Sequence, residues 1–216
     1  MLMSRTVFFL INIIAFVFIA GCRTNNTSIP FYNSPDFTPY FLSNEKEIEK
    51  IISHKISDFS FINQNEKIIS NMEIEDKIHV ANFMFTSCTS ICPDMTRSMK
   101  LVEDAFYDDP RVVILSYSVT PWIDTPDKLA DYAEFNNIKT DNWHFLTGNK
   151  SEIYSLARES YFAEETIGFS KDSTDFLHTE YFILVDRDKR IRGIYNGTLM
   201  LEALQVVEDI SALLNE

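Results

Sequence analysis

The stretch NFMFTSCTSICPDM, residues 82–95, contains two cysteines, Cys88 and Cys92, four positions apart. An apolar run precedes the pair and Pro93 follows it directly. A disulfide that closes so short a loop removes little entropy from the unfolded chain, so it would stabilise the fold only slightly. We therefore expect the pair to be functional. It can exchange electrons as a disulfide or hold a metal ion, because the thiolate is both the nucleophile and the ligand.

Pro93 indicates the first turn of a helix, with Cys92 at the positive end of that helix. Proline fits the first turn of a helix, where its missing N–H would be unpaired in any case. The positive end of the helix stabilises a thiolate there, so we expect the pKa of Cys92 to be lowered. A lowered pKa serves both chemistries and does not discriminate between them.

The loop between the cysteines is wider than that of redox enzymes of the thioredoxin type, which usually carry two residues there. This chain has three, Thr89, Ser90 and Ile91. A disulfide is still feasible, since the two Cα atoms of such a turn lie roughly 6 Å apart. The wider loop also leaves room for an ion between the sulfurs. Two thiolates favour soft ions, Cu(I) above all and Zn(II) as well.

A two-sulfur site needs a further ligand, and the chain offers four histidines. His54 precedes the first expected strand, His79 lies inside the cysteine-bearing strand, and His144 lies in a short strand. His178 lies in the polar loop KDSTDFLHTEYF, directly before a strand. In a thioredoxin-like sheet that strand runs antiparallel beside the cysteine strand. His178 is therefore the best-placed candidate.

Methionine and proline positions also bear on the choice of chemistry. Met84, Met95 and Met99 are soft ligands near the pair, but their spacing suits core packing better. No proline follows Pro126. The cis-proline that thioredoxin-type disulfide enzymes place opposite their cysteines is therefore missing, which favours the metal.

Strand and helix patterns alternate along the chain. This order predicts an α/β protein of thioredoxin-like fold, with a central mixed sheet flanked by helices and an N-terminal hairpin. The expected elements are a hairpin over 58–70, strands over 77–85, 111–119 and 143–147, helices after Pro93 and over 124–137 and 149–162, a strand pair over 179–197 and a last helix over 199–216.

Composition limits the class of protein. With 216 residues and 45% apolar residues the chain is long enough for one domain with a sizeable core. Its net charge of -13 comes without a basic patch, which argues against nucleic-acid binding.

The N-terminal residues predict export. Arg5 precedes the apolar run VFFLINIIAFVFIA, which is short for a membrane span and suits a signal peptide over residues 1–21. The following IAGC resembles the bacterial lipoprotein signal, which implies cleavage before Cys22 and attachment of a lipid to its sulfur. An uncleaved anchor is the alternative. Both place the remaining chain outside the cytoplasm, tethered to a membrane.

Residues 22–43 predict a tether, and residues 44–216 the domain. The tether holds three of the seven prolines among Asn, Ser and Thr residues, which suits an extended segment. Its aromatic residues indicate that part of it packs on the domain; they are Phe31, Tyr32, Phe37, Tyr40 and Phe41.

Four segments resemble the SCO/SenC family of copper chaperones, in matching order over residues 56–215. They are FTSCTSICPDM, SYSVTPWIDTPDKLADYAEFNNI, NWHFLTGNKSEIYSLARESYF and DFLHTEYFILVDRDKRIRGIYNG. The chain departs from the family pattern at Thr89, at Thr120–Pro121 and at Trp122–Ile123, none of which is a ligand position.

The resemblance implies one copper ion per chain, Cu(I) or Cu(II), bound by Cys88, Cys92 and His178. It implies delivery of copper to the dinuclear copper centre of cytochrome c oxidase, or maintenance of that centre's cysteines in the reduced form. The implied partners are the oxidase subunit that holds this centre and a thiol reductant or copper donor. The implied location is the bacterial cell envelope, on the periplasmic side of a membrane.

Two functions follow as hypotheses. The leading one is a metallochaperone that works by ligand exchange and is not an enzyme. The other is an extracytoplasmic thiol–disulfide oxidoreductase or redox sensor that uses Cys88 and Cys92 without metal. The two can coexist, since an oxidised pair cannot bind copper and the redox state would then control loading.

Overall fold

The computed structural model describes residues 28–163 and 179–216, whose strands form one mixed sheet in the order β2-β1-β9-β8-β5-β6-β7-β3-β4. The strands are β1 (Phe31–Tyr32), β2 (Pro39–Tyr40), β3 (Ser60–Asn63), β4 (Ile68–Ser70), β5 (Ile78–Met84), β6 (Val112–Ser118), β7 (Trp143–Thr147), β8 (Tyr181–Val185) and β9 (Ile191–Asn196).

The centre of the sheet is built by β5 and β6, whose seven residues each are all buried. Strands covered on both faces are near-continuous apolar runs, which is the pattern of both segments. They pair in parallel from Ile78↔Val112 to Met84↔Ser118. On the other side β8 runs antiparallel to β5, with Ala81 opposite Ile183. The start of β8 therefore lies beside the end of β5, as the sequence predicts.

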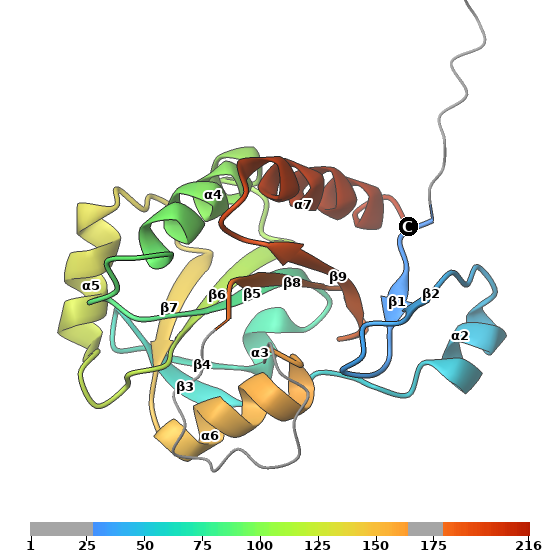
Figure 1. The fold of residues 1–216 in the computed structure, drawn as a ribbon, viewed down its shortest axis with the longest axis horizontal. Coiled ribbons are helices and arrows are strands. Elements are labelled where there is room, and N and C mark those ends of the chain that lie inside the picture. The colour runs from blue at the N-terminus through green and yellow to red at the C-terminus, as the bar shows by residue number, and fades with distance from the viewer. Residues whose placement is uncertain (1–27, 164–178) are drawn as a thin grey trace, which may run out of the picture.

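Helices cover both faces of the sheet (Figure 1). They are α2 (Glu45–Ile51), α3 (Asn71–Ile74), α4 (Cys92–Ala105), α5 (Pro126–Phe135), α6 (Lys150–Ser155), its π-helical continuation η2 (Leu156–Ser160) and α7 (Met200–Leu213). Figure 1 shows α4 and α7 side by side on one face and α6 on the opposite face. No helix within the described ranges is long and apolar enough to cross a membrane.

Each face of the sheet has its own apolar core. Met95 and Met99 of α4 and Ile210 of α7 pack in the first core. Tyr154 and Tyr161, from α6 and the residue after η2, pack in the second. The thioredoxin-like fold, with its mixed sheet between helices, is thus confirmed.

Most expected elements are present with slightly shorter bounds. The hairpin expected over 58–70 is formed by β3 and β4, and its turn is closed by the Asn63 N–H, which donates to the Lys67 carbonyl oxygen at 2.9 Å. The helix expected over 149–162 is instead two pieces, because an α-helical part passes into a π-helical one at Leu156. The short elements β1, β2, α2 and α3 are additions to the expected set.

Part of the expected tether belongs to the packed structure. Tyr32 of β1 pairs with Ile191 of β9, and Ile29 and Phe31 are buried, whereas Phe41 is 65% exposed. The predicted boundary before residue 44 therefore falls inside the packed unit, which reaches back to Ile29. The expectation that aromatic residues of this segment pack on the domain is confirmed for Phe31, Tyr32 and Phe37.

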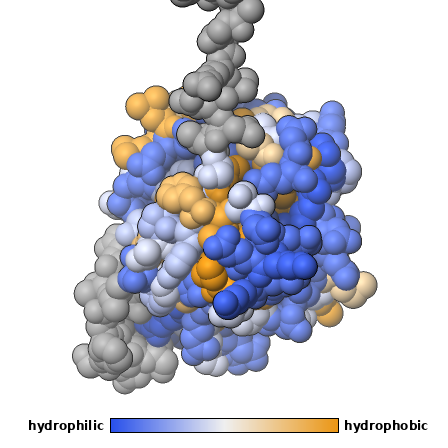
Figure 2. Space-filling view, turned by 90° about the vertical axis from the view of Figure 1, so that its right-hand side faces the viewer, coloured by the Kyte–Doolittle hydropathy of each residue, from blue (hydrophilic) through white to orange (hydrophobic). Residues whose placement is uncertain are grey.

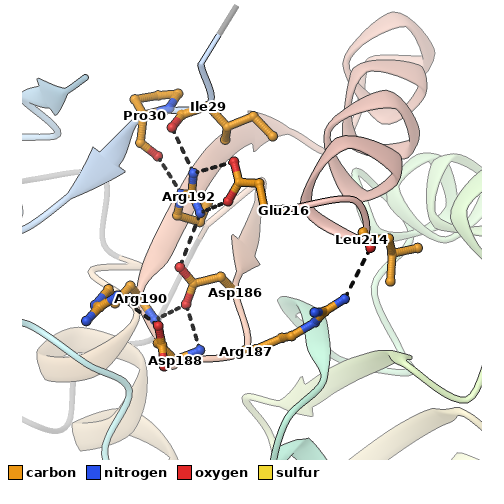
Figure 3. A network of polar contacts seen from close by, with 9 residues as sticks. All are labelled: Ile29, Pro30, Asp186, Arg187, Asp188, Arg190, Arg192, Leu214 and Glu216. Carbon is orange, nitrogen blue, oxygen red and sulfur yellow. Dashed lines mark hydrogen bonds and ion pairs between the residues drawn. The ribbon is translucent and has the colours of Figure 1, made fainter. Parts of the chain in front are cut away.

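Arg192 of β9 holds this segment in place (Figure 3). Its guanidinium donates to the carbonyl oxygens of Ile29 at 2.9 Å and Pro30 at 3.1 Å, and lies 3.9 Å from the centre of the Phe31 ring. It also pairs with the carboxylates of Asp186 and Glu216, at 3.3 and 2.8 Å. We call this set the Arg192 latch. Figure 2, turned to face this side of the molecule, shows a narrow apolar strip between hydrophilic flanks.

Candidate metal centre

The cysteine pair lies where β5 passes into α4. Cys92 is the first residue of α4 and Pro93 occupies its first turn, as expected. Cys92 is 3% exposed and Cys88 is half-buried, and both thiols are free. The Cys92 N–H donates to Cys88 Sγ at 3.4 Å. The Cys88 sulfur therefore faces the first N–H group of the helix, while the Cys92 side chain packs in the core with Met95 and Met99.

The electrostatics of the two thiols differ in a way that corrects the sequence-based expectation. Burial, with a hydrogen bond to the Cys88 thiol, raises the pKa of Cys92 to about 12. Partial burial also acts against ionisation of Cys88. Hydrogen bonds from the Cys92 thiol and from the N–H groups of Cys92, Ser90 and Ile91 outweigh it and lower the pKa of Cys88. The expectation of a lowered pKa at Cys92 is wrong, because the sulfur that faces the helix N–H groups is that of Cys88.

The candidate third ligand, His178, lies outside the described residues, as do Cys22 and the signal segment over residues 1–21. The strand that follows His178 starts beside the end of β5, and Thr179 is buried there. The part of the prediction that concerns strand topology is confirmed, and ligation by His178 stays a prediction. Within residues 28–163 and 179–216, no group of three His, Cys, Asp or Glu side chains is arranged to hold a metal ion.

The other three histidines are engaged elsewhere. His79 is fully buried, with Nε2 3.0 Å from the Tyr161 hydroxyl, and burial lowers its pKa to about 3. His144 Nδ1 lies 3.2 Å from the Asn63 side-chain amide nitrogen, and burial lowers the pKa of this histidine as well. His54 Nε2 lies 2.7 Å from a carbonyl oxygen of η2. None of the three belongs to a group of metal-binding side chains in the part of the chain that the structure describes.

The three methionines near the pair are core residues, as their spacing predicts. Met84 is 2% exposed, and Met95 and Met99 are fully buried. All three pack in the core that also contains Cys92.

The buried carboxylate of Asp124 beside the cysteine loop is not among the residues predicted from the sequence. Asp124 and Thr125 are both candidate caps for the helix that follows them, and the structure gives that role to Thr125. Asp124 is instead fully buried and accepts hydrogen bonds from Thr86, two residues before Cys88. The run of hydroxyl residues Ser118 and Thr120 before Asp124 is the signal that could have revealed it, since both donate to this carboxylate.

The donor set fits a soft metal ion. Cys88 is partly exposed and has a lowered pKa, and Cys92 follows four residues later with its thiol also outside any disulfide. Two thiolates at a helix N-terminus bind soft ions such as Cu(I) and can also close to a disulfide. The arrangement supports both chemistries.

A dithiol at the start of the helix that follows the central strand of a mixed sheet defines a thioredoxin-like protein. The family model of SCO1/SenC matches residues 49–215, and the chain belongs to this family.

Known relatives agree with this assignment. The chain is 30% identical over 169 residues to the SCO1 protein homolog of Bacillus subtilis, covering 77% of this chain and 86% of the relative. It is 30% identical, with a TM-score of 0.62, to the structure of BsSco, a member of the Sco family of cytochrome c oxidase assembly proteins in which a disulfide switch was identified; the match covers 74% and 93% of the two chains. It shares its fold with Bradyrhizobium japonicum ScoI, solved with copper bound, at 24% identity, a TM-score of 0.58 and coverage of 74% and 99%.

Proposed function

We propose that this protein is a copper metallochaperone that binds one copper ion through Cys88, Cys92 and His178. The observation that carries the proposal is the pair of free thiols at the start of α4, one half-buried with a lowered pKa and one in the core. Copper-bound ScoI of the same fold supports the choice of copper. Zinc remains the competing ion on the chemistry of the donors.

The unequal thiols give an order to ligand exchange. Cys88 is the more accessible and the more readily ionised, so it captures the incoming ion first. Cys92 must lose a proton from a buried thiol before it binds. On release, a partner's thiolate displaces Cys88 first, since its sulfur is the one exposed to approach. The ion moves between thiolate sets, the thiol protons pass to and from solvent, and no other covalent bond of the protein changes.

The recipient in this proposal is the dinuclear copper centre of cytochrome c oxidase. The support is membership of the family and the place of BsSco among cytochrome c oxidase assembly proteins. The domain would act outside the cytoplasm of a bacterium, held to the membrane by a lipid on Cys22. The apolar run and IAGC sequence near the N-terminus carry this part.

The first test is a Cu(I) titration of the reduced full chain in detergent, without oxygen, against a chelator of known affinity. The protein carries Cys22→Ser so that only two thiols remain. We expect one tightly held copper per chain, lost in Cys88→Ala and in Cys92→Ala. His178→Ala should weaken binding of Cu(I), Cu(II) or both, whereas His54→Ala, the matched control, should not. Binding no tighter than the chelator would refute the proposal, and an inert His178→Ala would refute the third ligand.

A thiol–disulfide role for the same pair is the second candidate. The lowered pKa and accessibility of Cys88 favour it, because they are the properties of an attacking thiolate. The disulfide switch in BsSco gives it further support. Reduction of a disulfide substrate by the metal-free protein, lost in Cys88→Ala, is the expected result if this role holds. No turnover above that of free glutathione would count against it.

A further inference from the structure

A buried carboxylate stands beside the start of the cysteine loop. Asp124, between β6 and α5, is fully buried. Its Oδ1 accepts a hydrogen bond from the Thr86 hydroxyl at 2.6 Å. Its Oδ2 accepts from the Thr86 N–H at 3.2 Å, the Ser118 hydroxyl at 2.6 Å and the Thr120 hydroxyl at 2.9 Å. Four neutral donors thus surround a carboxylate whose burial is costly without them.

These contacts join two strands beyond the end of their backbone pairing. β5 and β6 pair as far as Met84↔Ser118, and the Val119 N–H donates to the Met84 carbonyl oxygen at 2.9 Å. After Met84 the chain turns away from β6, and the Cys88 N–H donates to the Phe85 carbonyl oxygen at 3.2 Å. Asp124 therefore holds Thr86, the second residue of this turn, to the β6 side.

The two halves of the thiol site are fixed by different means. Cys92 is fixed by its place in α4 and by the core around it. Cys88 lies in the loop, and its sulfur must stay within reach of the Cys92 N–H. The position of Cys88 therefore depends on the first residues of the loop. Among them Thr86, two residues before Cys88, is held by Asp124.

We propose that Asp124 is a positioning residue that sets the place of the Cys88 sulfur relative to Cys92 by anchoring Thr86. Both oxygens of Asp124 already accept hydrogen bonds, so it acts through the loop and not as a ligand. The inference rests on the proposed function only in taking Cys88 and Cys92 as the working site. Asp124 anchors the loop in the conformation that it has when both thiols are free. The anchor therefore favours the reduced, metal-ready pair over the disulfide.

The test is the dithiol–disulfide equilibrium of the metal-free full chain, with Cys22→Ser throughout, in glutathione buffers. Closing the Cys88–Cys92 bond gives two electrons and two thiol protons to one oxidised glutathione, which becomes two reduced glutathiones. Asp124→Asn keeps the size of the side chain but removes one acceptor oxygen. We expect the equilibrium constant to shift toward the disulfide by about fivefold, the size of one buried hydrogen bond.

Glu103→Gln is the matched control. Glu103 on α4 is 2% exposed and accepts hydrogen bonds from the N–H groups of Lys139 and Thr140, away from the cysteines. It should lower stability while moving the thiol equilibrium less than about twofold. A shift in Asp124→Asn no larger than in this control, or one toward the dithiol, would overturn the proposal.

Thr86→Val keeps the test decisive even if Asp124→Asn does not fold. It removes only the hydroxyl donor of the 2.6 Å contact and should shift the equilibrium in the same direction. In the double variant the two shifts should combine to less than their sum, because they remove one shared interaction. An unshifted Thr86→Val, or full additivity, would contradict the proposal. Because no copper is present, a failed copper titration of the parent protein would refute the proposed function and leave this result standing.

Discussion

The two cysteines have different environments although only three residues separate them. Cys88 lies in the loop and faces the N–H groups at the start of α4, whereas Cys92 points into the core. The favourable end of a helix acts on the group that faces it and weakens over short distances. The helix N–H groups therefore stabilise the thiolate of Cys88, which precedes the helix, and not that of Cys92, which belongs to its first turn.

Copper binding at neutral pH should release protons, because both sulfurs bind as thiolates. With its pKa raised to about 12, Cys92 is fully protonated at pH 7 and must give up one proton. Cys88 adds a smaller amount because its pKa is lowered. We expect at least one proton per copper in a weakly buffered titration, and weaker binding on acidification. Release below one proton at pH 7, or the same release from Cys92→Ala, would contradict this assignment.

His79 predicts a loss of stability in acid. Burial lowers its pKa from 6.5 to about 3, so between these values only the unfolded chain takes up the proton. Stability is therefore constant above pH 6.5 and falls as the pH drops toward 3, by about 2 kcal/mol between pH 7 and pH 5.

Denaturant unfolding at both pH values measures this loss. His79→Gln should remove most of the slope, and His144, whose pKa is also lowered, should account for part of what remains. An unchanged slope in His79→Gln would show that another group is responsible.

At the scale of elements, the sequence predicts the parts whose signals are local. β5 and β6 are near-continuous apolar runs, and α5 begins at Pro126 after a capping threonine. The two-residue strands β1 and β2 have no such signal, because they are short, pair with each other and reach the rest of the sheet only where β1 pairs with the distant β9. The π-helical turn after Leu156 has none either, because its apolar positions also fit a single α-helix.

The candidate site likewise has features that the local sequence predicts and features that it does not. The thiol pair, the helix start and the place of the strand that follows His178 can be predicted from spacing and order along the chain. The burial of Cys92 and the contact between Asp124 and Thr86 do not, because each depends on segments that meet only in the folded protein. Asp124 and Thr125 are adjacent, yet one anchors the cysteine loop and the other caps α5.

Thr125→Ala tests whether Thr125 and Asp124 have separate roles, one in capping α5 and the other in anchoring the cysteine loop. The Thr125 side chain accepts a hydrogen bond from the Lys128 N–H at 3.4 Å, which caps α5. Its loss should lower the free energy of unfolding by about 1 kcal/mol. The thiol equilibrium in glutathione buffers should stay at the parent value. A shift as large as that expected for Asp124→Asn would mean that α5 as a whole, and not Asp124, positions the loop.

Across the whole molecule, the Arg192 latch joins both ends of the described chain to the sheet. Arg192 is 4% exposed and binds Ile29, Pro30 and Glu216 together with Asp186 (Figure 3). Burial raises the pKa of Asp186 and the charge of Arg192 acts against that rise. Removing the arginine leaves Oδ2 of this buried carboxylate without its ion-pair partner, while Oδ1 keeps the N–H groups of Asp188 and Arg190.

Arg192→Met should therefore lower the free energy of unfolding by about 3–5 kcal/mol. Arg190→Met, which breaks a pair with the exposed Asp188, should cost no more than about 1 kcal/mol. Denaturant unfolding gives both values. Limited proteolysis should also cut residues 29–43 faster in Arg192→Met than in the parent protein, and equal rates would show that the latch does not hold this segment.

The latch and the cysteines lie at opposite ends of β5. Asp186 directly follows Val185, which pairs with His79 near the beginning of β5, and the cysteine loop follows Met84 at its end. Seven residues of strand separate the two ends, a distance of roughly 20 Å. If a membrane tether joins the domain at Ile29, the thiols would lie at the end of the domain that is farther from the membrane. The length of chain before Ile29 would then set the height above the bilayer at which a recipient can meet them.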